Sequence, residues 1–140
     1  NTVSLALIMA FKCKSKRLKS LGKLSFLPGI FNVNEPVIFG LPLVLNPMMA
    51  IPFFIVPLVT VGISFAAMFF GLVPYPTGVT VPWTMPAPFG GWMMCADIRG
   101  GILQLIVLVI GGLIYYPFIN ALDQQYLKEE SAEAQTELKG

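Results

Sequence analysis

Apolar residues fill four long stretches of this chain, and two of these have the pattern of a continuous helix. Residues 101–119 are apolar except for Gln104 and a tyrosine pair. As a helix they would extend roughly 28 Å, which is close to the thickness of the hydrocarbon core of a bilayer. Residues 48–73 are long enough to cross with a tilt, and Pro52 and Pro57 are predicted to kink them. The pattern therefore predicts two transmembrane helices.

The other two apolar stretches, 27–47 and 73–91, are interrupted by helix breakers at short intervals. The breakers are Pro28, Gly29, Pro36, Gly40, Pro42, Pro47, Pro74, Pro76, Gly78, Pro82, Pro86 and Pro88. Because each proline removes a backbone donor and clashes with the preceding turn, no continuous helix is expected there. Irregular backbone at membrane depth is tolerated where protein buries it or water lines it. We therefore expect two re-entrant hairpins, at 25–47 and 74–91, of the kind that forms substrate sites in transporters.

The charged residues are sorted along the chain. Six of the nine basic residues lie between Lys12 and Lys23 with no acid among them, which predicts a basic loop at 12–24 on the cytoplasmic side. Binding of this segment to anionic lipid is compatible with that interpretation, whereas nucleic-acid binding is disfavoured without interleaved aromatic residues. Residues 1–11 are too short to span a bilayer and are interpreted as the end of a truncated helix. Residues 123–140 hold five acids and two lysines, which indicates a solvated cytoplasmic tail, either a helix extension or a disordered linker.

The composition strengthens the membrane assignment and restricts the possible chemistry. Apolar residues make up 56% of the chain and charged residues 11%, under half of the roughly 25% usual in soluble domains. Histidine is absent, and Cys13 and Cys95 lack the spacing of metal ligands, so both are interpreted as free structural thiols. No metal site and no cofactor are predicted. No phosphate-cradling loop precedes a Lys-Ser or Lys-Thr pair, so any energy for transport must come from a partner.

Glu35 is the one charged residue between Lys23 and Asp97, and it lies in the run Asn32-Val33-Asn34-Glu35-Pro36. An ionisable side chain in such an apolar region is costly, so it is a candidate for ligand contact. The alternative is a buried carboxylate satisfied by backbone amides or a distant arginine. Asn34, and with it Asn32, offers an amide that both donates and accepts hydrogen bonds. Trp83 has a flat apolar face that could stack on a ligand, and its alternative role is an interfacial anchor.

Several distinctive motifs follow one another along the chain. They are PGIFNVNEPVIFGLPLVLNP at 28–47, GLVP at 71–74, TGVTVPWT at 77–84, DIRG at 97–100 and YYPF at 115–118. In this order they resemble the motifs of the lactose/cellobiose family of enzyme IIC permeases of the bacterial phosphotransferase system. The resemblance extends from Asn1 to about Asp123.

This resemblance implies an all-α membrane protein with transmembrane helices and two Pro/Gly-broken re-entrant hairpins. Residues 1–122 would form the C-terminal part of the permease domain, a fragment unable to transport alone. The whole permease would be a multi-pass, homodimeric protein of the bacterial cell membrane that contacts lipid. It would bind a disaccharide and present a hydroxyl group to a phosphocysteine on a IIB partner. Glu35 would lie near that hydroxyl, with a histidine from the preceding half of the domain, and Trp83 would pack against the sugar.

Two other functions stay open on the residues alone. An ion-coupled transporter uses similar broken helices, but normally needs more than one membrane acid in such a region. A structural membrane segment would tolerate the replacement of Glu35 by glutamine or leucine. Phosphoryl transfer would in any case need the IIB partner, so catalysis by this segment itself is undecided.

Overall fold

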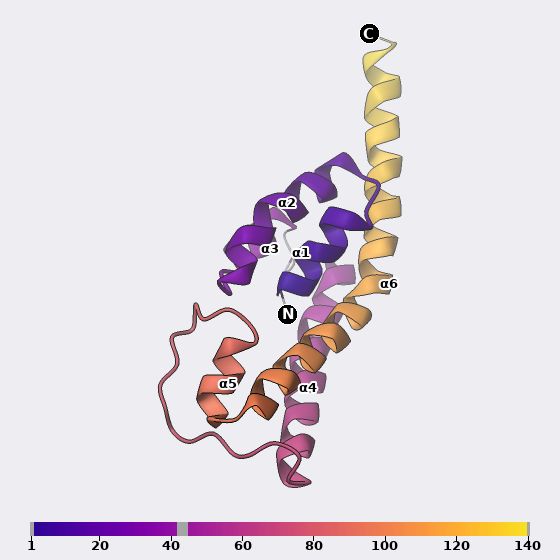
Figure 1. Ribbon diagram of the computed structural model, residues 1–140. Coiled ribbons are helices and arrows are strands. Elements are labelled where there is room, and N and C mark those ends of the chain that lie inside the picture. The colour runs from indigo at the N-terminus through magenta and orange to yellow at the C-terminus, as the bar shows by residue number, and fades with distance from the viewer. Residues whose placement is uncertain (1, 42–44, 140) are drawn as a thin grey trace.

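The computed structural model describes residues 2–41 and 45–139, with the backbone alone for Thr2, and its regular elements in these ranges are all helices. This confirms the predicted all-α class. The elements, in chain order, are α1 (Thr2–Phe11), α2 (Lys16–Ile30), α3 (Glu35–Gly40), α4 (Pro47–Phe69), α5 (Phe89–Cys95) and α6 (Ile98–Glu137). Figure 1 shows α6 as the longest helix, running from the top of the molecule into its lower half, with α1 packed beside its middle and α2 packed on α1.

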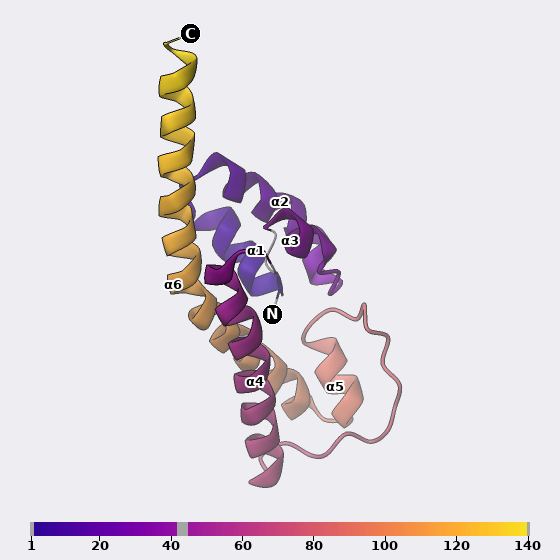
Figure 2. The same cartoon turned by 180° about the vertical axis from the view of Figure 1, so that it is seen from behind.

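Helices α4 and α6 are long enough and apolar enough to cross a membrane, in agreement with the predicted spans at 48–73 and 101–119. They run side by side along the lower half of α6, as Figures 1 and 2 both show. Asn46 caps the N-terminus of α4, and its side chain accepts a hydrogen bond from the Met48 N–H at 3.1 Å. Asp97 caps α6 in the same way, through the Arg99 N–H at 2.9 Å.

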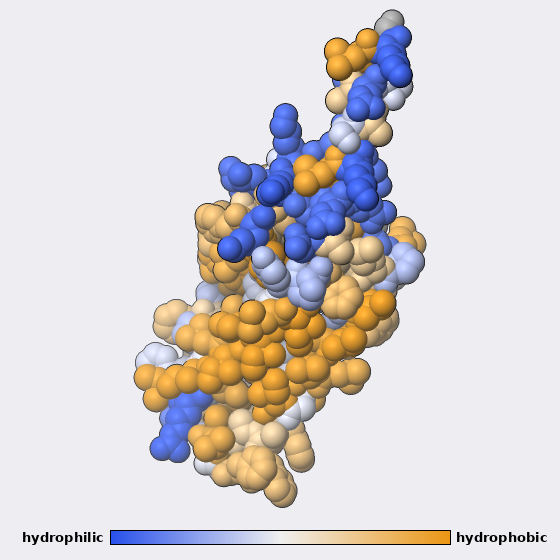
Figure 3. Space-filling model, turned by 90° about the vertical axis from the view of Figure 1, so that its right-hand side faces the viewer, coloured by the Kyte–Doolittle hydropathy of each residue, from blue (hydrophilic) through white to orange (hydrophobic). Residues whose placement is uncertain are grey.

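The charged segment that follows the second span continues the same helix. Helix α6 extends to Glu137, so of the two predicted forms for 123–140 the structure has the helix extension. Figure 3 shows hydrophilic residues gathered at this end and apolar residues covering the other half of the face in view. Many large apolar side chains of α4 are exposed, among them Phe54, Leu58 and Phe65, as expected for a helix whose surroundings are lipid or further protein.

The predicted basic loop at 12–24 needs correction, because α2 already begins at Lys16. Only residues 12–15 connect α1 to α2. The charge pattern located the segment but did not determine its conformation, because lysine, arginine and leucine are all good helix formers. A side face of α2 made of small residues packs against α1: Gly22, Ser25 and Gly29 are buried there.

The two predicted hairpins differ in form. At 25–47 the chain makes a helix, a tight turn at 31–34 and the short helix α3, whereas Pro42 to Val44 lie outside the described residues. At 74–91 the chain has one helical arm rather than two: residues 74–88 are irregular and α5 follows. The spacing of Pro74, Pro76, Pro82, Pro86 and Pro88 explains this, because too few residues separate them for a helical turn to continue. Entry of either segment into a membrane from one side stays a prediction.

The contact between α1 and α2 depends on the absence of a side chain at Gly22. A Cβ atom placed there would lie 2.5 Å from the Ala10 nitrogen and 2.8 Å from the Met9 carbonyl carbon, and neither backbone atom can move aside cheaply. We expect Gly22→Ala to force the helices apart and to destabilise the protein by about 1 to 3 kcal/mol. The matched control is Gly62→Ala in α4, where nothing lies within 4 Å of the added carbon. Thermal unfolding in detergent checks this, and equal melting temperatures for the two variants would contradict it.

Candidate functional site

The turn between α2 and α3 carries three of the four predicted site residues. Asn32 adopts a left-handed backbone conformation with φ of +62°, which asparagine tolerates better than most residues. The Asn32 and Val33 N–H groups donate to the carbonyl oxygens of Gly29 and Pro28, which closes the end of α2. Helix α3 then begins at Glu35, with Pro36 in its first turn where a missing N–H costs nothing. The turn therefore displays two amides and a carboxylate within four residues.

This turn contacts the irregular segment that carries Trp83. The Asn32 side-chain nitrogen donates a hydrogen bond of 2.9 Å to the Trp83 carbonyl oxygen, across 51 positions of sequence. Because a carbonyl oxygen only accepts, this bond determines the orientation of the Asn32 amide. Two broken segments that were singled out separately from the sequence thus meet in the fold.

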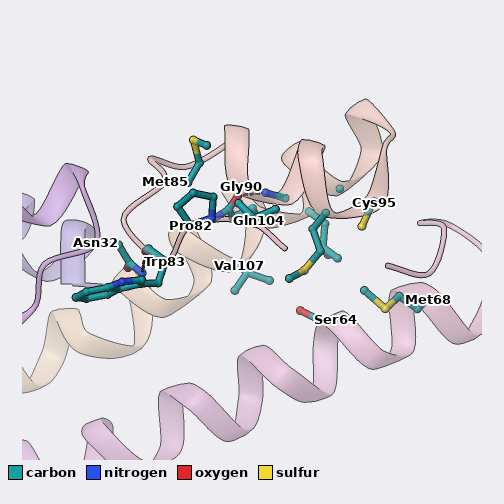
Figure 4. Close-up of a pocket in the computed structure, with 15 residues that line it drawn as sticks. Asn32, Ser64, Met68, Pro82, Trp83, Met85, Gly90, Cys95, Gln104 and Val107 are labelled. Atoms are coloured by element: carbon teal, nitrogen blue, oxygen red, sulfur yellow. Dashed lines mark hydrogen bonds between the residues drawn. The ribbon is translucent and has the colours of Figure 1, made fainter. Parts of the chain in front are cut away.

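A cavity of about 330 Å³ lies at this meeting point. Figure 4 shows Asn32 and Trp83 at one side of it, Ser64 and Met68 on α4, and Gln104 and Val107 on α6. A neighbouring cavity of about 210 Å³ shares Asn32, Met85, Gln104 and Val107 with it. The walls are mostly apolar with a few polar groups, which is the usual character of a small-molecule site.

The predicted site residues do not all reach this cavity. Asn32 and Trp83 line it, and the Trp83 side chain is 70% exposed within this chain. Glu35 is exposed and Asn34 is half-buried at the start of α3, and neither is among the cavity-lining residues. The structure therefore brings Asn32 and Trp83 together at the cavity and places Asn34 and Glu35 next to Asn32, outside the cavity lining.

Gln104 lines both cavities and was missed as a site residue in the sequence. The signal was available, because Gln104 is the only side chain with an amide or a charge between Arg99 and Asn120. A polar side chain inside a membrane span is expected to have a partner or a function.

A second polar cluster lies at the start of α2, away from the cavity. The Asp123 carboxylate of α6 accepts hydrogen bonds from the Lys14 N–H at 3.0 and 3.1 Å and from the Ser15 N–H at 2.8 Å. The Glu130 carboxylate accepts from the Ser15 hydroxyl at 2.7 Å and from the Arg17 N–H at 3.3 Å. These hydrogen bonds lower the pKa of Glu130. Two acids of the helix extension thus attach the α1–α2 linker to α6.

Cys13 lies under this attachment and is buried. The pKa of its thiol is raised to about 12, mainly by burial and to a smaller extent by the negative charge of Asp123. Such a thiol stays protonated and unreactive near neutral pH, in agreement with its interpretation as a structural thiol. The described part of the chain contains no cluster of three or more His, Cys, Asp or Glu residues suited to a metal ion.

Comparison with known proteins gives consistent matches. Residues 1–57 match the family described as "Phosphotransferase system, EIIC". The lichenan permease IIC component of Bacillus subtilis (strain 168) is 46% identical over 131 residues, which are 93% of this chain and 29% of that protein. The cellobiose-specific EIIC component of Geobacillus stearothermophilus is 50% identical over 133 residues, 94% of this chain and 30% of that protein.

A solved structure is similar to this fold over most of the chain. It is the crystal structure of the transporter ChbC, the IIC component from the N,N'-diacetylchitobiose-specific phosphotransferase system, with a TM-score of 0.90 and 45% identity. The match covers 93% of this chain and 30% of that one. The chain thus spans less than a third of the length of the relatives that it matches.

Proposed function

Because the chain belongs to the enzyme IIC family of the phosphotransferase system, we propose that it forms the C-terminal part of a disaccharide permease. The permease binds a disaccharide of the cellobiose, lactose or chitobiose type and moves it across the bacterial cell membrane. A phosphocysteine on a cytoplasmic IIB partner phosphorylates the sugar as it is transported. The substrate class follows the names of the relatives, among which are cellobiose-specific and lactose-specific components.

The observation that carries this proposal is the hydrogen bond between Asn32 and Trp83 at the edge of the cavity. A disaccharide offers hydroxyl groups that both donate and accept, and ring faces that are apolar. The turn at 31–34 supplies amides for the hydroxyl groups, and Trp83 supplies an aromatic surface for a ring face. The cavity volume falls at the lower end of the range typical of small-molecule sites.

Glu35 would act on the hydroxyl group that receives the phosphoryl group. Its carboxylate accepts the hydroxyl proton while the sugar oxygen bonds to phosphorus and the bond from phosphorus to the cysteine sulfur breaks. Glu35 is exposed at the start of α3, as a group must be if both a sugar and a partner protein are to approach it. Asn34 would orient the same hydroxyl, and a histidine from another part of the permease would complete the site.

The whole permease would be a multi-pass protein of the cell membrane that functions as a homodimer. The exposed apolar side chains of α4 and α6 would face lipid or other helices of the permease. The basic residues between Lys12 and Lys23 and the acidic end of α6 would lie on the cytoplasmic side, where the IIB partner binds.

Membrane vesicles containing a permease of full family length with this sequence would test the function. We expect radiolabelled cellobiose to be converted to sugar phosphate only when phosphorylated IIB protein is added, at a rate unaffected by collapse of ion gradients. Uptake of unmodified sugar driven by an ion gradient would instead indicate an ion-coupled transporter.

Substitution of Trp83 by alanine should weaken sugar binding about tenfold, because stacking of a sugar ring face on an aromatic side chain contributes on the order of 1 kcal/mol.

A further inference from the structure

We propose that Gln104 is a sugar-binding residue, whose side-chain nitrogen donates a hydrogen bond to an oxygen of the ligand in the cavity. This inference rests on the proposed function and deepens it by adding a residue from α6. Gln104 is half-buried and lines both neighbouring cavities, as Asn32 does, and Figure 4 shows it beside Gly90.

The orientation of the Gln104 amide follows from one hydrogen bond. The Gly91 N–H of α5 donates to the Gln104 Oε1 at 2.7 Å. Because the Gly91 N–H needs an acceptor, the Gln104 oxygen must be the atom that faces it, and the Gln104 NH₂ group therefore points away from the Gly91 N–H. Within the described ranges, the structure records no hydrogen bond from that nitrogen.

The surroundings leave a ligand as the natural acceptor. Met85 and Val107, which line both cavities together with Gln104 and Asn32, have apolar side chains that offer the nitrogen no strong acceptor. The Gln104 nitrogen is not among the fully buried unpaired atoms of the described residues, so it is open to a ligand in the cavity. A sugar hydroxyl oxygen would accept a hydrogen bond from it when the ligand binds.

The backbone around Gln104 keeps the group in place. A Cβ atom on Gly91 would collide with the Gly100 carbonyl oxygen and would lie 2.9 Å from the Gln104 Oε1. Helices α5 and α6 therefore touch backbone to backbone, which leaves the side chain of Gln104 little freedom. A donor that is already oriented loses little entropy when the ligand binds.

A purely structural role, in which Gln104 only attaches α5 to α6, makes a different prediction. Gln104→Glu keeps an oxygen for the Gly91 N–H but loses the donor, so it separates attachment from donation. Gln104→Met is neutral, has a similar length and loses both. Gln124→Glu introduces the same charge at an exposed position of the same helix and serves as the control.

Equilibrium binding of cellobiose and its monodeoxy analogues to the purified full-length permease, without IIB protein, tests the assignment. At pH 7.5 we expect Gln104→Glu and Gln104→Met to bind cellobiose about tenfold more weakly than the wild type. Affinity of the glutamate variant should recover at acidic pH, where its protonated carboxyl group becomes a donor. In the wild type, one monodeoxy analogue, which lacks the hydroxyl group that Gln104 contacts, should bind more weakly than cellobiose. In Gln104→Met the same analogue and cellobiose should bind with equal affinity. A structural role would not produce this difference.

The outcomes separate the two proposals. The role of Gln104 would be overturned, without affecting the proposed function, by either of two results. One is wild-type affinity of Gln104→Glu for cellobiose at all pH values. The other is that each analogue loses the same affinity, relative to cellobiose, in the wild type and in Gln104→Met. A wild-type permease that binds no disaccharide would overturn the proposed function and this assignment together.

Discussion

Replacing Glu35 by glutamine is expected to abolish phosphorylation of the sugar by phosphorylated IIB protein. Glutamine has the shape of glutamate and still forms hydrogen bonds, but it cannot take up the hydroxyl proton. Loss of a general base lowers a rate by roughly 10² to 10⁴. Because the Glu35 side chain is exposed at the start of α3, its replacement should leave the fold and membrane insertion intact. The rate of sugar phosphate formation at saturating sugar measures the effect.

A matched variant separates this role from a general effect of charge. Glu137→Gln removes an acid from the exposed end of α6 and should phosphorylate sugar at the wild-type rate. A fall in the maximal rate with little change in sugar affinity would assign Glu35 to the chemical step. Wild-type phosphorylation rates in Glu35→Gln would exclude it.

Replacing Asp123 by alanine is expected to detach the α1–α2 linker from α6. The Asp123 side chain is 4% exposed and accepts from the backbone N–H groups of Lys14 and Ser15. Its removal leaves two donors without an acceptor, each at a cost of about 1 to 3 kcal/mol when buried. We expect a total destabilisation of about 2 to 6 kcal/mol. Glu129→Ala, which removes an exposed acid of the same helix, should have little effect.

Alkylation of Cys13 reports this detachment directly. In the wild type the buried thiol, with a pKa of about 12, should react slowly with a maleimide at pH 7.5. In Asp123→Ala both causes of the raised pKa weaken, so the thiolate fraction and the rate of labelling should rise. The labelling rate is compared between Asp123→Ala and Glu129→Ala, with Cys13→Ser as the control for other cysteines. Equal rates in both variants would contradict the attachment.

The sequence predicted the transmembrane helices well, for a simple physical reason. A stretch such as 101–119 has to satisfy every backbone group internally, so an apolar run of bilayer length is sufficient to predict a helix. A hairpin at 25–47 was predicted, but its turn at 31–34 was not located, because Pro28, Gly29 and Pro36 were all counted as breakers and α2 continues through the first two.

Conformation in the charged and proline-rich segments was harder to predict. The lysines of 12–24 indicate a side of the membrane but fit a helix as well as a loop, and the packing of Gly22 on α1 selects the helix. In 74–88 the prolines exclude long helices but do not say what path the chain takes. That path is determined by contacts such as the one from Asn32 to Trp83.

The candidate site was predicted in part. Asn32 and Trp83 were chosen for their chemistry, and their proximity is a property of the fold that neither motif contains. Gln104 stood out as a polar residue in an apolar helix, but its bond to Gly91 and its place in the cavity need the packing of α5 on α6. The Asp123 contacts join residues 108 and 109 positions apart, which no local pattern predicts.

A structure of the full-length permease with bound cellobiose would test the central claim most directly. The sugar should occupy the cavity between the turn at 31–34 and Trp83, with a ring face against the indole. A hydroxyl oxygen should lie within about 3 Å of the Glu35 carboxylate. A disaccharide bound elsewhere, with Glu35 and Trp83 both out of contact with it, would contradict the assignment of this site.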